Sequence, residues 1–151
     1  MAGWALDCAA RVLPLFEASR PDDRRPARAI AVGREWVATG VFRMPVIRTA
    51  SLDAHAGAKE AEDPAAIAAA HAAGQAVATA HVAQHAFGGA LYALRAVAAR
   101  AQDDAFAAAV VERAWQSERL PARLRDEVMD RVVVEPSRRG LRIAIRKDEG
   151  F

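Results

Sequence analysis

The chain has 151 residues, 53% of them hydrophobic, and a formal net charge of +2. This length suits one domain with a real core and is too short for two typical domains, and the near balance of 21 basic and 19 acidic residues argues against nucleic-acid binding driven by charge. A single cysteine excludes an intrachain disulfide, and the absence of a basic leader or an 18-residue uncharged apolar run leads us to expect a soluble, cytoplasmic protein without a membrane partner.

Two helices are predicted at the beginning of the chain. Apolar side chains at helical spacing indicate a first helix over residues 3–18, in which Pro14 can introduce a kink. The polar segment SRPDDRRP then separates it from a second helix, which we expect to be capped by Asp22 or Asp23 and to end at Gly40. These two helices should form a hairpin.

The middle of the chain predicts three more helices. Residues 45–63 read as one helix, and the alanine-rich segment 64–100 continues from Asp63 as N-cap and Pro64 at the first helical position. A single helix to Arg100 would be about 55 Å long, more than a domain of this size accommodates. Its apolar face also changes phase, so we expect a break near residues 79–84 and two closely packed helices.

The last third of the chain is predicted to contain two helices and a different C-terminal segment. Asp103 is expected to cap a helix with its apolar face formed by Phe106, Val110, Val111 and Trp115, and Pro121 opens another. Two β-branched runs then flank the sequence PSRRG, which fits either a small β-hairpin or a loose basic tail.

Taken together, these elements predict an all-α, single-domain helical bundle of about six to seven helices. The bundle would occupy residues 1–135, and residues 136–151 would form the basic tail or hairpin. The apolar stripes predict a core that contains Trp4, Cys8, Phe16, Trp36, Leu91, Leu94 and Trp115.

The histidines offer one candidate site. On a helix, His81 and His85 would project from one face a turn apart, the spacing of two metal ligands, with His71 on the same stripe. His55, or the carboxylates of Asp53 and Glu60, could complete a divalent-metal site that activates water. The catalytic glutamate of the zincin motif is absent between the two histidines, however, so structural pairing of these imidazoles is the favoured reading and no cofactor is expected. Tyr92 is the one aromatic side chain that we add to this site.

Two groups of arginines offer a second candidate, a surface for an acidic protein partner. The N-terminal group follows the first helix and the C-terminal group lies in the last segment, where nucleic-acid binding through residues 138–147 is the weakest alternative. The partner-binding candidates are Arg24, Arg25, Arg28, Arg138, Arg139 and Arg142.

Covalent catalysis and nucleotide binding lack a motif. Cys8 lies among core positions, and the sequence contains no G-x-S-x-G elbow, no phosphate-binding G-x-x-x-x-G-K-[ST] and no G-x-G-x-x-G. An enzyme is therefore not the favoured interpretation, and self-association through the small-residue helices stays open.

Three segments together resemble a family of small actinobacterial immunity proteins of polymorphic toxin systems. They are WALDCAARVLPLFE at residues 4–17, the second helix through REWVATG, and AVATAHVAQHAFGGALYALRA at residues 76–96. The resemblance implies an all-helical, non-enzymatic protein that binds and neutralises a cognate toxin. The family features carried by this chain are Trp4, Asp7, Cys8, Trp36, His81, His85 and Tyr92, all of which fit a scaffold role.

Overall fold

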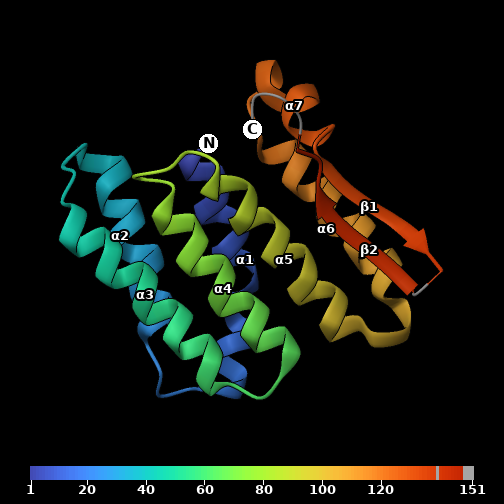
Figure 1. The fold of residues 1–151 in the computed structure, drawn as a ribbon, viewed down its shortest axis with the longest axis horizontal. Coiled ribbons are helices and arrows are strands. Elements are labelled where there is room, and N and C mark those ends of the chain that lie inside the picture. The colour runs from blue at the N-terminus through green and yellow to red at the C-terminus, as the bar shows by residue number, and fades with distance from the viewer. Residues whose placement is uncertain (139, 148–151) are drawn as a thin grey trace.

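A computed structural model describes residues 1–138 and 140–147 of the chain. The helices are α1 (Ala2–Ser19), α2 (Arg25–Thr39), α3 (Met44–Glu60), α4 (Pro64–Ala78), α5 (His85–Ala101), α6 (Ala105–Arg119) and α7 (Ala122–Met129), with a short 3-10 helix η1 (Gln102–Asp104) between α5 and α6. Strands β1 (Val132–Ser137) and β2 (Gly140–Ile145) form an antiparallel hairpin, in which Val132 pairs with Ile145 and Ser137 with Gly140. The fold is an all-α bundle with a C-terminal hairpin (Figure 1).

Helix α4 is the centre of the bundle and contacts α1, α2, α3 and α5. Nearly all of its residues are buried, and most of these are alanines, whose short side chains let neighbouring helices approach closely. Its beginning is as predicted, because the Asp63 carboxylate accepts a hydrogen bond from the Ala65 amide at 3.0 Å. The predicted break is also confirmed, since turns occupy residues 79–84 between α4 and α5.

Other boundaries follow from local chemistry, with small differences. Gly40 has a φ of 69°, the left-handed conformation that ends α2 at the predicted glycine. Helix α3 ends at Glu60, three residues before the predicted end at Asp63. The Asp103 cap is wrong, because this residue lies inside η1 and no side chain caps α6.

The core confirms part of the predicted set. Trp4, Cys8, Phe16 and Leu94 are buried, and burial raises the pKa of the Cys8 thiol. Three other predicted core residues are only partly buried, namely Trp36 and Trp115, which pack against the core, and Leu91.

The predicted inner face of α6 is wrong. Phe106, Val110 and Val111 are 43%, 44% and 65% exposed, whereas Glu112 and Gln116 face the interior of the bundle. The Gln116 carbonyl accepts a hydrogen bond from the Trp4 indole at 2.9 Å, which joins α6 to α1. Polar pairing with α1 therefore decides which face of α6 is buried.

The hairpin packs against α5, α6 and α7. The Arg113 guanidinium of α6 donates to the Val132 and Met129 carbonyls, at 2.9 and 2.7 Å, and so fixes where β1 begins. Of the two structures considered for this segment, the hairpin is the one observed over the described residues. The expected division after residue 135 falls within β1 and stays a prediction.

Candidate functional site

The four histidines gather between α3, α4 and the beginning of α5. His55 lies on α3, His71 on α4, His81 in the α4–α5 loop and His85 at the first position of α5. The Nδ1 atoms of His55 and His71 are 2.7 Å apart, and the ring centroids of His81 and His85 are 5.3 Å apart. The Tyr92 ring lies 5.0 Å from that of His71. The structure thus brings the predicted residues together.

The observed geometry differs from the predicted one that favoured a metal site. His81 follows the end of α4, so it shares no helical face with His85. Glu60, a carboxylate expected to complete the site, instead accepts two hydrogen bonds from Arg25, at 2.9 and 2.7 Å. Across residues 1–138 and 140–147, no group of three or more His, Cys, Asp or Glu side chains could hold a metal ion. The arrangement therefore gives no support to the hydrolase alternative.

Burial keeps three of the imidazoles neutral near pH 7. It lowers the pKa of His55, His71 and His85, helped at His55 by repulsion from His71 and at His85 by repulsion from His81. In the close pair, one Nδ1–H donates and the other Nδ1 accepts, an arrangement that requires at least one neutral ring.

A hollow of about 350 Å³, here called the histidine hollow, opens beside this cluster. In the part of the chain that the structure describes, no aspartate or glutamate lines it. Its only permanently charged side chain is that of Arg48, which is exposed and, among the described residues, has no ion pair or side-chain hydrogen bond. Its polar lining consists of Arg48, Ser51, His55, Gln75, His81 and His85.

Two glycines make room for the polar side chains of the cluster. A Cβ at Gly74 would lie 2.8 Å from the His55 ring, and a Cβ at Gly88 would lie 2.5 Å from the Gln75 amide oxygen. That oxygen is 2.7 Å from Nδ1 of His85, which donates to it as the amide is oriented. The close approach of α4 to both neighbours is thus what places His55 and His85.

We predict that Gly74→Ala lowers the free energy of unfolding by about 1–3 kcal/mol, because the His55 ring has to move away from its partner. Urea unfolding measures this loss, and the His55 and His71 ring resonances should shift with it. Gly3→Ala is the matched control, since nothing lies within 4 Å of a Cβ there. Equal stability of the two variants would show that His55 is not fixed by this contact.

The α2–α3 and α4–α5 connections lie at the same end of the bundle (Figure 1), and several of the exposed apolar residues lie in or beside these two connections. A smaller hollow of about 210 Å³, lined by Trp36, Val41 and Val46 among others, lies on the α2 side of α3. Met44, at the start of α3, lines the histidine hollow, whereas Val46 lines the smaller one. The two hollows therefore lie on either side of the first turns of α3. The apolar end, as we call it, comprises Val37, Val41, Phe42, Met44, Val46 and Val82, each 40–54% exposed.

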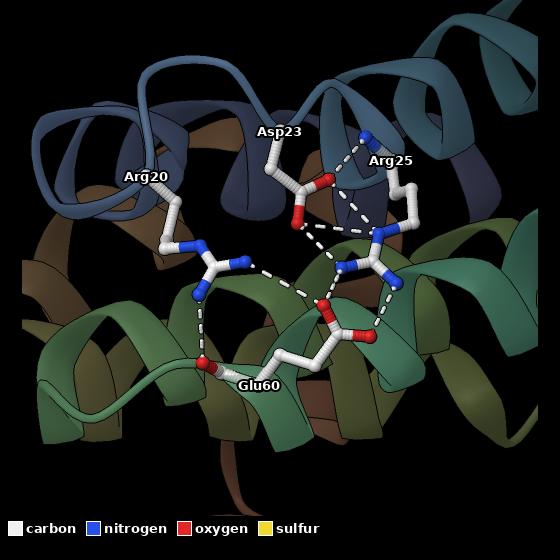
Figure 2. Close-up of polar contacts among 4 residues, drawn as sticks. All are labelled: Arg20, Asp23, Arg25 and Glu60. Carbon is white, nitrogen blue, oxygen red and sulfur yellow. Dashed lines mark hydrogen bonds and ion pairs between the residues drawn. The ribbon is translucent and has the colours of Figure 1, made fainter.

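The N-terminal basic group is largely engaged in ion pairs within the chain. Figure 2 shows Arg25 held between Asp23 and Glu60, with Arg20 on the far side of the same Glu60. These contacts raise the pKa of Arg25 and lower those of both carboxyls. The Asp23 carboxylate also accepts from the Arg25 amide, a cap-like contact at the start of α2. Arg25 therefore ties α2 to the end of α3.

The other predicted partner-binding arginines differ in availability. Arg24 pairs with Glu17, whereas Arg28 is exposed and has no ion pair among the described residues.

In the C-terminal group, Arg142 pairs with Glu135 across the hairpin. Arg138 is exposed near the tip, and Arg139 lies outside the described residues. Figure 1 places the hairpin far from the α1–α2 connection, so the two basic groups form no single surface.

Sequence reasoning missed Arg48, Gln75 and the apolar end. A signal for the last was present, because the segment VFRMPV directly follows the helix-ending Gly40 and places apolar side chains where a turn is usually polar.

The described helices include none long and apolar enough to cross a membrane. Comparisons with curated proteins and with solved structures found no match. The family model described as "Imm-5 like putative immunity protein" matches residues 1–123, which include α1 to α6, the histidine cluster and the apolar end but not the hairpin. The chain therefore belongs to this family of Imm-5-like immunity proteins.

Proposed function

We propose that this immunity protein acts without chemistry of its own, by binding a cognate toxin through the apolar end and covering the toxin's functional surface. The partner is a protein, as membership of an immunity family implies. The cytoplasm, where the toxin would act, is the proposed compartment.

The concentration of exposed apolar side chains at one end carries this proposal. Exposed apolar side chains gathered in this way favour a protein–protein contact, because burying them under a partner removes apolar surface from water. The segment from Val37 to Val46 presents five such side chains within ten residues, and Val82 lies in the α4–α5 connection. A surface left uncovered in the isolated chain is thus available to a partner.

The shape of the apolar end, with its two hollows, also fits a binding surface. Interfaces gain most of their affinity from a few large side chains that enter pockets near the centre. Here the hollows on both sides of α3 could accept large side chains of the toxin, and the exposed Phe42 side chain could enter a pocket on the toxin. A standard interface covers roughly 800 Å² on each partner, which one end of a bundle this size can offer.

A second apolar surface, formed by Phe106, Val110 and Val111 of α6, is the rival candidate. This surface lies on the single helix α6. The elements that precede and follow α6 in the sequence are η1 and α7, and neither belongs to the histidine cluster. The two surfaces can be separated by single substitutions of similar exposure.

We predict that Phe42→Asp raises the dissociation constant for the toxin by roughly 30-fold or more, since loss of a central anchor typically costs at least about 2 kcal/mol. The test pairs the protein with a candidate cognate toxin domain, in a co-expression growth assay and by calorimetry on the purified proteins. Val111→Asp, at 65% exposure on α6, is the control and should leave binding unchanged.

Each outcome has a distinct meaning. If Val111→Asp weakens the complex and Phe42→Asp does not, the toxin binds α6 instead of the apolar end. If the wild-type chain neither forms a complex nor restores growth, direct neutralisation is wrong. Circular dichroism of both variants confirms that the fold is retained.

A further inference from the structure

We propose that the histidine hollow binds a carboxylate, supplied by an aspartate or glutamate side chain of the bound toxin. This inference rests on the proposed function, because the hollow adjoins the apolar end through Met44. It adds to that function the chemical class of the group recognised.

The charges around the hollow favour an anion. Arg48 is its permanent cation, and the imidazoles of His55, His81 and His85 add donors that become cationic on protonation. Within residues 1–138 and 140–147, no acidic side chain lines the hollow to neutralise them. The Arg48 guanidinium has no ion-pair partner among the described residues, so a carboxylate could accept paired hydrogen bonds from it, with the imidazoles beside them.

The hydrogen bonds inside the hollow show which donors are free for such a ligand. The Ser51 hydroxyl donates to the Gly74 carbonyl at 2.9 Å, and the Gln75 oxygen already accepts from His85. The His81 ring has no hydrogen bond among the described residues and is exposed. Arg48 and His81 are therefore the side chains that would first contact the carboxylate.

The neighbouring elements reinforce the same sign of charge. Lys59 of α3 acts on His55 and His71 and lowers the pKa of both, and Arg95 lies over the Tyr92 ring on α5 at 5.4 Å. On the far side of the Gln75 and His85 pair, the described residues that line a second hollow include Arg95 and Lys147. The cluster thus lies in a basic environment from α3 to α5.

Binding of a carboxylate should be coupled to uptake of protons. Because burial lowers the pKa of His55 and His85, a bound anion, which raises these pKa values again, draws protons onto the two rings. Affinity should therefore increase as the pH falls from 8 towards 6. A carboxylate on the toxin fits better than a free anion, since Met44 and Leu52 give the rim of the hollow an apolar surface that a protein partner would cover.

The first test uses glutarate as a small carboxylate probe on the full chain labelled at histidine nitrogens. We expect saturable shifts of the His55, His81 and His85 resonances, with a dissociation constant on the order of millimolar, as a single charge-assisted contact gives. Arg48→Ala should abolish saturation. Arg123→Ala removes an exposed arginine of α7 and should leave it intact. Shifts that match those of chloride at equal ionic strength would overturn the proposal.

The second test measures the toxin complex. Arg48→Ala should weaken it about tenfold or more, the effect of losing a hydrogen bond to a charged group, whereas Arg123→Ala should not change it. Wild-type affinity should be about threefold or more tighter at pH 6.0 than at pH 8.0, and a His55→Gln/His85→Gln variant should lose that dependence.

The two proposals fail in different ways. If Phe42→Asp weakens the complex while Arg48→Ala and the change of pH do not, the toxin binds the apolar end and the carboxylate proposal is wrong. If no complex forms at all, the proposed function fails, and saturable glutarate binding decides alone whether the hollow is a carboxylate site.

Discussion

Phe16→Ala should lower the free energy of unfolding by about 3–5 kcal/mol, a large share of the roughly 5–15 kcal/mol of a typical domain. Phe16 is fully buried near the end of α1, and its ring reaches α3, where a Cβ at Gly57 would be 3.5 Å from Cζ. Truncation leaves a cavity that alanine-rich neighbours cannot fill, because their side chains are too short to move into it. Urea unfolding measures the change as a lower midpoint with an unchanged slope.

Phe42→Ala is the control for this measurement. It removes the same side chain from a position that is 47% exposed, so the expected change in stability is within about 0.5 kcal/mol. Comparable losses in the two variants would mean that Phe16 is not a principal core residue. A loss confined to Phe16→Ala would show that stability and the proposed binding surface depend on different phenylalanines.

Much of the fold could be predicted because its boundaries follow from chemistry within a few residues. Asp63 and Pro64 begin α4, and Gly40 ends α2 by adopting a left-handed conformation. The break between α4 and α5 was visible as a change in the phase of the apolar face. In each case the relevant interaction joins residues that are close in sequence, so the sequence alone contains the information.

The orientation of α6 could not be predicted, because it depends on partners far away in the chain. Both faces of this helix carry residues at helical spacing, and the apolar face with Phe106 and Val110 appeared the better candidate for burial. The structure buries Glu112 and Gln116 instead. Arg11 of α1 donates to the Glu112 carboxylate and the Gln116 amide nitrogen donates to the Ala90 carbonyl of α5, whereas the Gln116 Oε1 atom has no hydrogen-bond partner among the described residues. Arg11 and Glu112 are 101 residues apart, so their pairing leaves no pattern in the sequence of α6 itself.

The sequence predicted which histidines form the candidate site but not how they are arranged. The sequence pointed to the histidines, yet His81 and His85 meet across a turn rather than along one helical face. Arg48 could not be distinguished from other exposed arginines, because its significance comes from the absence of acidic side chains around the hollow. That property depends on three segments packing together, α3, α4 and the beginning of α5.

Arg11→Ala should lower the free energy of unfolding by about 2–4 kcal/mol at pH 8, because it leaves the Glu112 carboxylate buried without its cation. Nε of Arg11 lies 2.7 Å from Glu112, whose side chain is 2% exposed, and Gln116 donates to the same carboxylate at 3.1 Å. We expect less than the full cost of breaking a buried pair, since the Arg11 side chain is 41% exposed and partly screened.

The loss in Arg11→Ala should depend on pH with a definite sign. Burial already raises the pKa of Glu112, despite the opposing hydrogen bonds from Arg11 and Gln116, and removal of Arg11 raises it further. A carboxyl whose pKa is higher in the folded state favours folding below its unfolded pKa and loses that contribution as the pH rises. The difference in stability between Arg11→Ala and the wild type should therefore be small near pH 5 and grow towards pH 8.

A second substitution separates the charge from the packing of Arg11 over the Trp115 ring, 4.4 Å from its centroid. In Arg11→Ala/Glu112→Gln the buried group is neutral at every pH, so most of the stability lost at pH 8 should return and the dependence on pH should disappear. The cation–π contact would account for only about 0.5–1 kcal/mol of what remains lost. If the double variant is no more stable than Arg11→Ala at pH 8, the stacking on Trp115, rather than the buried carboxylate, determines the role of Arg11 in joining α1 to α6.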